Sequence, residues 1–525
     1  MKINPDTHAI PGPSQDQIIA APHLNLELPQ PPKRFYRHGW QSWTLTTWLD
    51  PSSPPLPIRA PEFRAKDEDP AYAFHKNHVS AWVGAAELGE DDILLVGALG
   101  LSGRVELSDY TLTGFYEDSR EGEWLISRGA ENEVFEKYAT LLETKFGKTR
   151  FEKPPRVWCS WYSLYKWIDE NILAKTLYEL GDLAFDVFQI DDGWQDESGH
   201  WEAGKNFPLG MAAFADKIQA TGRTAGIWLS PFIVTPNLKI FKEHTDWILR
   251  DEKGSLVSAG MNWTGTTYAL DLTHPEVLEW LDKLIRKIVG WGYQYLKLDF
   301  LYAGAALGKQ YKSTPREEAY RQALRVIREA AGDAYLLACG APIIPSLGLC
   351  DGIRIGPDVT PFWLNKAMTV WLNNPNDPAT QNAIRTSIHR LWLKPLVNID
   401  PDVLYFRSRY NALKAHESQL LQDLGAITGF KATSDLPHWM NESELENLQD
   451  FLSASPSVQK KNRYEFLIDE RIVDFSSAVP MTESHLDIPV WLAKYSGMLK
   501  IGWHLALPAI LASAKSRMEL QFRQA

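Results

Sequence analysis

The sequence contains few cysteines and no long apolar segment. Its 525 residues include three cysteines, a number too small and too odd for a disulfide framework. The longest apolar stretch, residues 501–514, is interrupted by His504 and Pro508, so we expect no membrane-spanning helix. The N-terminal residues are polar, include prolines and lack the apolar core of a secretory signal. We therefore expect a cytoplasmic protein that does not enter a membrane.

Positive charge is also scarce. The 54 lysines and arginines are outnumbered by 66 aspartates and glutamates, which gives a formal net charge of −12. Such a chain offers no basic surface for a phosphate backbone, so nucleic-acid binding is not expected as the main function. Tryptophan, in contrast, is abundant, with 21 residues. This number fits either a large core or a site that stacks the flat apolar faces of sugar rings on indole groups.

The N-terminal part of the chain has the pattern of a β-rich domain. Short alternating or apolar runs, separated by clusters of Gly, Asp and Pro, occur at residues 78–87, 92–100 and 104–116. Residues 50–72 contain six prolines and predict a long surface loop. The Pro154–Pro155 pair marks a boundary. We predict a β-sandwich domain over residues 1–152.

Beyond Arg156, short apolar strands alternate with amphipathic segments, which is typical of βα units around a parallel sheet. The predicted strands are residues 157–161, 187–190, 225–229, 295–298, 335–338, 352–355, 396–399 and, with a weaker pattern, 426–428. Eight strands of this kind predict an α/β fold with a central (β/α)8 barrel over residues 153–455. The alternative is a doubly wound sheet, but no G-x-G-x-x-G motif follows the first strand. Strand-like pieces at 464–475 and 487–504 predict a small C-terminal β domain over residues 456–525.

Carboxylates follow several of the predicted strands where each strand ends. They are Asp191, Asp192, Asp299, Asp358, Asp400 and Asp402. Barrel enzymes build their sites at the carboxyl ends of the strands, so these side chains should converge on one rim. A single aspartate after a strand is more often the cap of the next helix. A cluster drawn from four strand ends is costly unless it serves a ligand, a metal ion or proton transfer.

The residues around this rim favour sugar chemistry over a metal site. None of the 13 histidines falls at a strand end, where metal-dependent barrel hydrolases supply imidazole ligands. A hard cation held by carboxylates alone stays an alternative. The other hypothesis is a pair of carboxylates that act on a glycosidic bond, one as nucleophile and one as general acid. Tryptophans predicted at the same rim offer stacking faces for a pyranose: Trp161, Trp194, Trp228 and Trp363.

Two aspartates are the candidates for this pair. Asp299 ends the string YLKLDF, and Lys297 shares its strand face because strand side chains alternate. A cation beside Asp299 would keep that carboxylate ionised, as a nucleophile requires. Asp358 lies on a loop after the strand, from which it could protonate the leaving oxygen. The nearby Arg354 would bind a sugar hydroxyl or pair with a local carboxylate.

Several long motifs resemble one known family. The strings WCSWYSLY, FQIDDGWQ, GIWLSPF, YLKLDF, ACGAPIIPSLGLCDGIRIGPD and VNIDPD are similar to those of the α-galactosidases of glycoside hydrolase family 36, and they occur in the same order. RHGWQSW in the N-terminal region resembles the W-Q-S-W element of that family. The resemblance implies an N-terminal β-supersandwich, a (β/α)8 barrel and a C-terminal β domain.

The resemblance also implies roles for individual residues. Asp299 matches the nucleophile and Asp358 the acid/base. The tandem Asp191 and Asp192 match the pair that binds the O4 and O6 hydroxyls of galactose, and Trp43 would close the site from the N-terminal domain or, alternatively, be a buried sandwich tryptophan. The further sugar-binding or pocket-lining positions are Tyr162, Trp228, Lys297, Cys339, Gly340 and Arg354.

We therefore predict a retaining exo-α-galactosidase that acts on small α-galactosides such as melibiose or raffinose, with no cofactor and no metal ion. Transglycosylation, or activity on α-N-acetylgalactosaminides, is the alternative within the same family. A non-catalytic sugar-binding protein is the alternative from another class, but it would lack the nucleophile or the acid. The oligomeric state is not predicted.

Overall fold

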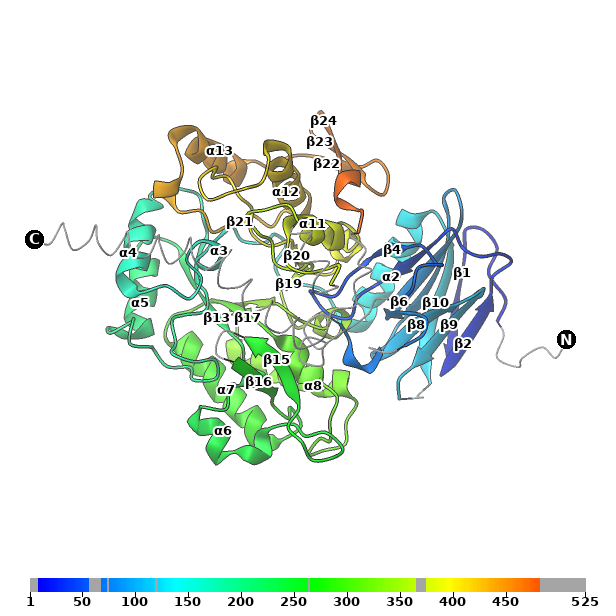
Figure 1. The fold of residues 1–525 in the computed structure, drawn as a ribbon, viewed down its shortest axis with the longest axis horizontal. Helices are drawn as coiled ribbons and strands as arrows, with labels where there is room; N and C mark the ends of the chain where they lie inside the picture. Colours follow the sequence, from blue (N-terminus) through cyan, green and yellow to red (C-terminus); the bar gives the residue numbers. More distant parts are fainter. Residues whose placement is uncertain are drawn as a thin grey trace, which may run out of the picture.

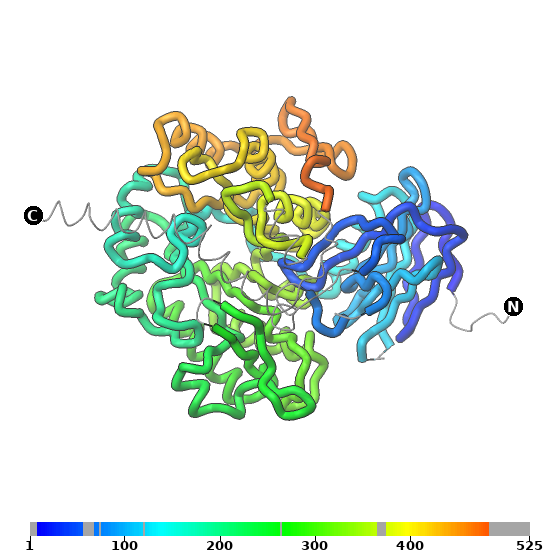
Figure 2. The backbone as a smooth tube through the Cα atoms, viewed as in Figure 1, coloured from blue at the N-terminus to red at the C-terminus, as the bar shows by residue number. Residues whose placement is uncertain are grey.

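The structure, a computed structural model, describes residues 8–55, 68–72, 75–118, 121–262, 265–364 and 374–481. Two antiparallel sheets lie at the N-terminal end of the molecule, drawn in blue and cyan in Figure 1. They are followed by an eight-stranded parallel sheet surrounded by helices. The tube in Figure 2 shows the chain passing from the barrel into a last group of strands, drawn in orange, on the side of the N-terminal sheets.

The two N-terminal sheets pack face to face as a β-sandwich, because one apolar cluster takes residues from both sheets, such as Leu24, Leu94, Val105 and Ile126. The six-stranded sheet has the order β1 (Gln15–Ala21), β10 (Gly122–Gly129), β7 (Asp92–Ala98), β6 (Val83–Gly89), β3 (Arg34–Arg37) and β4 (Thr47–Leu49). The four-stranded sheet has the order β2 (His23–Glu27), β9 (Thr111–Tyr116), β8 (Gly103–Ser108) and β5 (His78–Ala81).

Strand β7 is apolar at nearly every position because both of its faces are covered. Leu94 and Val96 point into the sandwich core. Ile93 and Leu95 belong to the large cluster that also contains Tyr138 of helix α2 (Glu131–Phe146) and the barrel core. A strand buried on both faces loses the alternation of apolar and polar residues, which explains its continuous run DILLVGA. The sandwich is therefore joined to the rest of the molecule through α2.

The central sheet is a (β/α)8 barrel, as predicted. Its neighbouring strands pair in parallel. A parallel bridge between Leu404 and Thr433 joins the segment after the seventh strand to the eighth strand. The order is β20 (Asn398–Asp400), β19 (Gly352–Arg354), β18 (Tyr335–Ala338), β17 (Tyr295–Leu298), β13 (Thr224–Leu229), β12 (Val187–Ile190), β11 (Val157–Cys159) and β21 (Ala432–Thr433).

Helices connect these strands. The α-helices are α3 (Trp161–Leu164), α4 (Glu170–Glu179), α5 (Gly210–Gln219), α6 (Lys239–Glu243), α7 (Pro275–Gly290), α8 (Arg316–Ala331), α9 (Ile343–Ser346), α11 (Thr380–Ile388), α12 (Ala415–Thr428) and α13 (Glu442–Ser453). Short 3-10 helices are η1 (Pro70–Tyr72), η2 (Thr245–Trp247), η3 (Leu301–Ala305), η4 (Leu391–Leu393), η5 (Pro437–Trp439) and η6 (Ser476–Ala478). Between β13 and α7 the chain inserts a small antiparallel sheet of β14 (Ile233–Val234), β16 (Gly265–Ala269) and β15 (Ser258–Asn262).

The eighth strand is not where the sequence predicted it. Residues 426–428 form the last turn of α12, which buries Leu421, Leu424 and Ile427 at helical spacing. Gly429, with a φ of 81°, ends this helix in the left-handed conformation. The strand that closes the barrel is β21, which has two residues. Two residues are too few for any periodicity, so the apolar end of the helix was mistaken for the strand.

The last described strands form an antiparallel sheet of β22 (Val458–Lys460), β23 (Glu465–Ile468) and β24 (Arg471–Asp474). It includes the strand-like piece predicted at 464–475, whereas the piece at 487–504 lies outside the described residues. The predicted domain limits at 152/153 and 455/456 stay predictions. Within the described ranges, no helix combines the length and the apolar character that crossing a bilayer requires.

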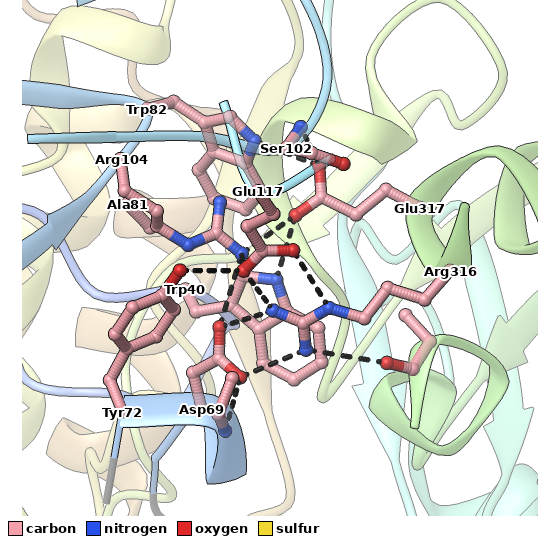
Figure 3. Close-up of polar contacts among 12 residues, drawn as sticks. Trp40, Asp69, Tyr72, Ala81, Trp82, Ser102, Arg104, Glu117, Arg316 and Glu317 are labelled. Atoms are coloured by element: carbon pink, nitrogen blue, oxygen red, sulfur yellow. Dashed lines mark hydrogen bonds and ion pairs between the residues drawn. The ribbon is translucent and has the colours of Figure 1, made fainter. Parts of the chain in front are cut away.

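A buried cluster of charges joins the N-terminal sandwich to the barrel (Figure 3). Glu317, at the start of α8, accepts hydrogen bonds from the indole nitrogens of Trp40 at 3.2 Å and Trp82 at 3.0 Å. Its carboxylate also pairs with Arg104 of the sandwich at 3.0 Å. The adjacent Arg316 pairs with Asp69 of the sandwich at 2.7 Å. Each side of this interface thus supplies charges that the other side neutralises.

We expect the variant Glu317→Ala to lower the free energy of unfolding by about 3–5 kcal/mol, because it leaves the buried Arg104 short of one carboxylate and two indole N–H groups without an acceptor. Urea unfolding of the variant and the parent protein measures this difference. The matched control is Glu279→Ala, which removes an exposed pair with Lys283 on α7 and should cost less than about 1 kcal/mol. Equal effects of the two substitutions would contradict a structural role for the cluster.

Candidate active site

A pocket lies at the carboxyl ends of the barrel strands. Its cavity volume is about 90 Å³. Its wall combines residues at or beyond the ends of the barrel strands with one residue of the N-terminal region. Eight of the predicted site residues line it: Trp43, Tyr162, Asp191, Asp192, Trp228, Lys297, Asp299 and Asp358.

The other three predicted residues lie behind this wall. The guanidinium group of Arg354 is 3.3 Å from the hydroxyl of Tyr162, so it supports the wall from inside. A side chain on Gly340 would come within 3.0 Å of the Trp43 ring. Cys339 follows β18 and is 1% exposed. These three positions shape the pocket without forming its surface.

A buried ion pair joins the ends of two strands. The Lys297 ammonium group on β17 lies 2.8 Å from the Asp191 carboxylate, which follows β12. The Gln189 side chain donates to the same oxygen at 2.6 Å. Burial alone opposes the charged form of Lys297, but the carboxylate of Asp191 outweighs it and raises the pKa of Lys297 well above its ordinary value. The ammonium group is therefore permanently charged.

Two aspartates act on Lys297. The sequence predicts its cation beside Asp299, two residues later on the same strand face, and the charge of Asp299 contributes to raising the pKa of Lys297. The hydrogen bond of the ammonium group is to Asp191. Lys297 is in register with Trp228 of β13, and the indole nitrogen of Trp228 donates to Asp299 at 2.9 Å. The neighbouring strand thus supplies the donor for Asp299 and leaves the ammonium group for Asp191.

Asp192 has an unusual electrostatic environment. Burial raises the pKa of Asp192 to about 7, and the negative charges of Asp191 and Asp299 act in the same direction. One of its oxygens accepts a hydrogen bond of 2.6 Å from the Gln195 side chain, which lowers the pKa in part. Asp191 and Asp192 are therefore not equivalent: Asp191 is paired with a cation, whereas Asp192 changes its protonation near neutral pH.

Both oxygens of Asp299 are held by N–H donors. In addition to the indole of Trp228, the backbone N–H of Phe300 donates to Asp299 at 2.8 Å. Phe300 has a φ of 53°, in the left-handed region that side chains other than glycine rarely adopt. Strained backbone of this kind persists where the surrounding structure enforces it, often at functional sites. The carboxylate of Asp299 is thus fixed in one orientation at the end of β17.

Arg354, at the end of β19, forms ion pairs with three carboxylates. It pairs with Asp400 at 2.9 Å, with Asp402 at 2.9 Å and with Asp358 at 3.3 Å. The side chains of Asp400 and Asp402 are 2% and 0% exposed, whereas that of Asp358 is 37% exposed. Of the three, Asp358 alone lines the pocket. Arg354 therefore anchors Asp358 from below while leaving it accessible.

Asp402 also braces the loop that carries Asp358. Its carboxylate accepts a hydrogen bond of 2.9 Å from the backbone N–H of Val359. Burial raises the pKa of Asp402, Arg354 opposes this shift, and the charges of Asp358 and Asp400 add to it. Asp400 and Asp402 thus hold Arg354 and the loop in place rather than facing the pocket.

The N-terminal region contributes Trp43, which lies on the loop between β3 and β4. Its ring meets Phe300 and Tyr302 edge-on, with ring centres 5.5 Å and 5.9 Å apart. The side chain of Asn376 donates to the carbonyl of Trp43 at 2.5 Å. The structure places this tryptophan in the pocket wall and not in the sandwich core. Gly340, with a φ of 54°, gives the ring the space that it occupies.

A potential metal-binding group lies elsewhere. Asp246, His274 and Glu276 have ligand atoms within 4.8 Å of one another near the start of α7. Nδ1 of His274 accepts a hydrogen bond of 3.3 Å from the backbone N–H of Glu276 and so caps the helix. A neutral imidazole that accepts at Nδ1 carries its proton on Nε2. In this arrangement the Nδ1 lone pair of His274 serves the cap of α7.

Three comparisons with known proteins each find similarity to sugar hydrolases. A family model described as Melibiase matches residues 125–330. The structure of TtGalA, an α-galactosidase from Thermus thermophilus, has 44% sequence identity and a TM-score of 0.83, and the match covers 88% of this chain and 94% of that chain. The chain belongs to the α-galactosidases of glycoside hydrolase family 36.

Two further relatives are more distant from this chain than TtGalA. AgaA from Geobacillus stearothermophilus, a solved structure of family 36, shares the fold at 13% identity with a TM-score of 0.58, over 82% of this chain and 62% of that chain. The curated Alpha-galactosidase Mel36A from Lactobacillus acidophilus is 26% identical over 128 residues, which are 22% of this chain. That match spans 18% of Mel36A, well under two thirds of its length.

The pocket of this family 36 member also contains residues that the sequence did not identify. Met261 and Asn262 come from the inserted strand β15, and Asn376 and Pro378 from the loop before α11. None of them directly follows a barrel strand, so the pattern of polar residues at strand ends could not reveal them. Phe300 follows Asp299 directly, but its apolar side chain gave no such signal.

Two tryptophans expected at the rim have other surroundings. Trp194 is fully buried, and its indole nitrogen donates to the carbonyl of Trp228 at 3.0 Å. It packs beside Trp201, with ring centres 6.0 Å apart. Trp363 packs against a second apolar cluster and is not part of the pocket wall. Trp161 and Trp228, by contrast, line the pocket.

The raised pKa of Asp192 leads to a prediction about stability. An unfolded chain ionises an aspartate near pH 4, whereas the folded protein holds this proton up to about pH 7. Between these values only the folded state keeps the proton, so Asp192 lowers the stability of the fold progressively as the pH rises, and the full cost remains above pH 7. Asp192→Asn should therefore raise the thermal midpoint more at pH 8 than at pH 5. Equal shifts at the two pH values would contradict the raised pKa.

Proposed function

We propose that this protein is a retaining exo-α-galactosidase that removes terminal α-galactosyl units from small galactosides through a covalent intermediate on Asp299. The observation that supports this proposal is that one pocket contains two aspartates with different environments. Asp299 is fixed by two N–H donors, and the partly exposed Asp358 is held by Arg354. Family membership supports it, since the TtGalA structures are complexes with p-nitrophenyl α-D-galactopyranoside and with stachyose.

In this mechanism Asp299 attacks the anomeric carbon while Asp358 gives a proton to the departing oxygen. The bond to the leaving group breaks as the bond to Asp299 forms. Asp358, now ionised, then takes a proton from the water that releases galactose and frees Asp299. The orientation of Asp299 suits the first role, because a nucleophile must be aligned before attack. The exposure of Asp358 suits the second, because it must reach both the leaving oxygen and water.

Asp191 and Asp192 account for the preference for galactose. Both line the pocket, and a sugar with an axial O4 would donate to carboxylate oxygens there. Glucose has an equatorial O4 and would leave these acceptors without partners. An unpaired buried polar group costs about 1–3 kcal/mol, which is enough for a strong preference. Lys297, which is locked against Asp191, offers its remaining N–H donors to neighbouring hydroxyls.

A panel of nitrophenyl α- and β-glycosides, with melibiose and raffinose added, tests this function. We expect kcat/KM for the α-galactoside to exceed that for the α-glucoside and the α-N-acetylgalactosaminide by at least about 100-fold. A higher value for the N-acetylated substrate would assign the protein to that alternative. Longer oligosaccharides formed at high melibiose concentration would show transglycosylation. Binding of galactose without turnover of any substrate would support a sugar-binding protein.

The stereochemistry of the first product tests the retaining mechanism. We expect α-galactose to appear first by NMR, since retaining enzymes hold their two carboxyl groups about 5–5.5 Å apart and water cannot attack in the first step. Asp299→Gly should lose essentially all activity, and added azide should restore turnover with the β-galactosyl azide as product. Asp358→Ala should still react with a substrate that has a good leaving group, and azide should then yield the α-anomer. If β-galactose appears first, or if both variants give the same azide, the roles are wrong.

A further inference from the structure

Arg390 is a buried cation that contacts both parts of the pocket wall. It follows α11 and is fully buried. Its guanidinium group donates to the carbonyls of a single loop of the N-terminal region and to one carbonyl at the end of β19. The acceptors are Gly39 at 2.9 Å, Gln41 at 2.9 Å, Ser42 at 2.7 Å, Thr44 at 3.1 Å and Ile355 at 3.0 Å.

Retaining a charge at this position is costly. Within the described residues, Arg390 makes no ion pair with a carboxylate, and burial lowers the pKa of Arg390 to about 9. Buried charges are normally paired, because desolvation of a lone ion is expensive. Arginine is nevertheless suited to this place, since its planar group presents several N–H donors in fixed directions. The carbonyls that it binds belong to an irregular loop that has no sheet to satisfy them.

The two segments that Arg390 joins each carry a residue of the pocket. Trp43 lies between the bound carbonyls of Ser42 and Thr44. Ile355 directly follows Arg354 and precedes Asp358 by three residues. One side chain therefore bonds both to the loop that carries Trp43 and to the segment that leads to Asp358.

We propose that Arg390 is a positioning residue for the reaction. It fixes the positions of Trp43 and of the Asp358 loop relative to each other across the pocket. This proposal rests on the proposed function. Arg390 itself does not line the pocket, so it acts through these two residues. A lysine at this position keeps the charge but cannot bridge five carbonyls, and it should release the loop.

Arg390→Lys is compared with Arg223→Lys. Arg223 is also a buried arginine bound to carbonyls, those of Gly181 and Leu183, but it precedes β13 at the opposite end of the barrel. Both variants should lose thermal stability. Arg390→Lys should also lower kcat/KM about 100-fold, the effect of a small misplacement of catalytic groups. This loss should be larger for melibiose than for the nitrophenyl galactoside, because melibiose depends on Asp358. Arg223→Lys should keep kcat/KM.

A double-mutant cycle with Trp43→Ala separates positioning from general destabilisation. We compare the fold-loss in kcat/KM that Arg390→Lys causes in two backgrounds. If Arg390 acts through Trp43, this fold-loss should be at least about 5 times smaller in the Trp43→Ala variant than in the parent protein. Strictly multiplicative losses would overturn the proposal, as would unchanged kinetics of folded Arg390→Lys.

Two further controls complete the test. If Arg390→Lys does not fold, Arg390→Gln takes its place, because glutamine keeps two N–H donors without the charge. If neither variant folds, Arg390 is a structural residue only, and the proposal is overturned. Absence of galactosidase activity in the parent protein and in Arg223→Lys would refute the proposed function instead, so the two failures are distinguishable.

Discussion

The accumulation of negative charge at one end of the barrel is the constraint on which the site depends. Six aspartates lie at or behind the pocket wall together with two cations, Lys297 and Arg354. Carboxylates brought together away from water repel one another, so each needs its own compensation. Asp191 has the ammonium group, Asp358, Asp400 and Asp402 share the guanidinium group, and Asp192 can keep a proton. Asp299 accepts hydrogen bonds from the N–H groups of Trp228 and Phe300 and lines the pocket.

The site is shared between two parts of the molecule. The barrel supplies the carboxylates, and the N-terminal region supplies Trp43 on a loop held by contacts to α8, to α9 and to Arg390. Backbone hydrogen bonds from Ser42 to Ala341 and from Ile343 to Trp40 add to these contacts. The position of Trp43 is thus determined largely by barrel residues, although its own sequence neighbours form strands of the sandwich. A change in this loop would alter the pocket without touching the barrel.

Much of this arrangement could be read from the sequence, because its signals are local. Apolar strands followed by Asp191, Asp299 or, one loop later, Asp358 identify both the barrel and its active rim. The features that the sequence did not predict depend on contacts between residues far apart in the chain. The hydrogen bond from Lys297 to Asp191 follows from the register of neighbouring strands, and the wall residues of β15 come from an insertion without a barrel-strand pattern. Strand β21 has two residues, too few to show the alternation of side chains that identifies a strand in a sequence. The role of Arg390 is invisible in sequence, since its partners are backbone carbonyls.

The charge cluster between sandwich and barrel has a consequence for the order in which the protein acquires its structure during synthesis. Arg104 and its partner Glu317 are separated by 213 residues. At translation rates of 5–20 residues per second, the arginine waits about 10–40 s for that carboxylate to emerge from the ribosome. Until then the face of the sandwich that later becomes an interface exposes a cation and two indole groups, Trp40 and Trp82, to solvent or to a chaperone. The sandwich is therefore made before the barrel, but its interface is completed only after Glu317 of the barrel has been made.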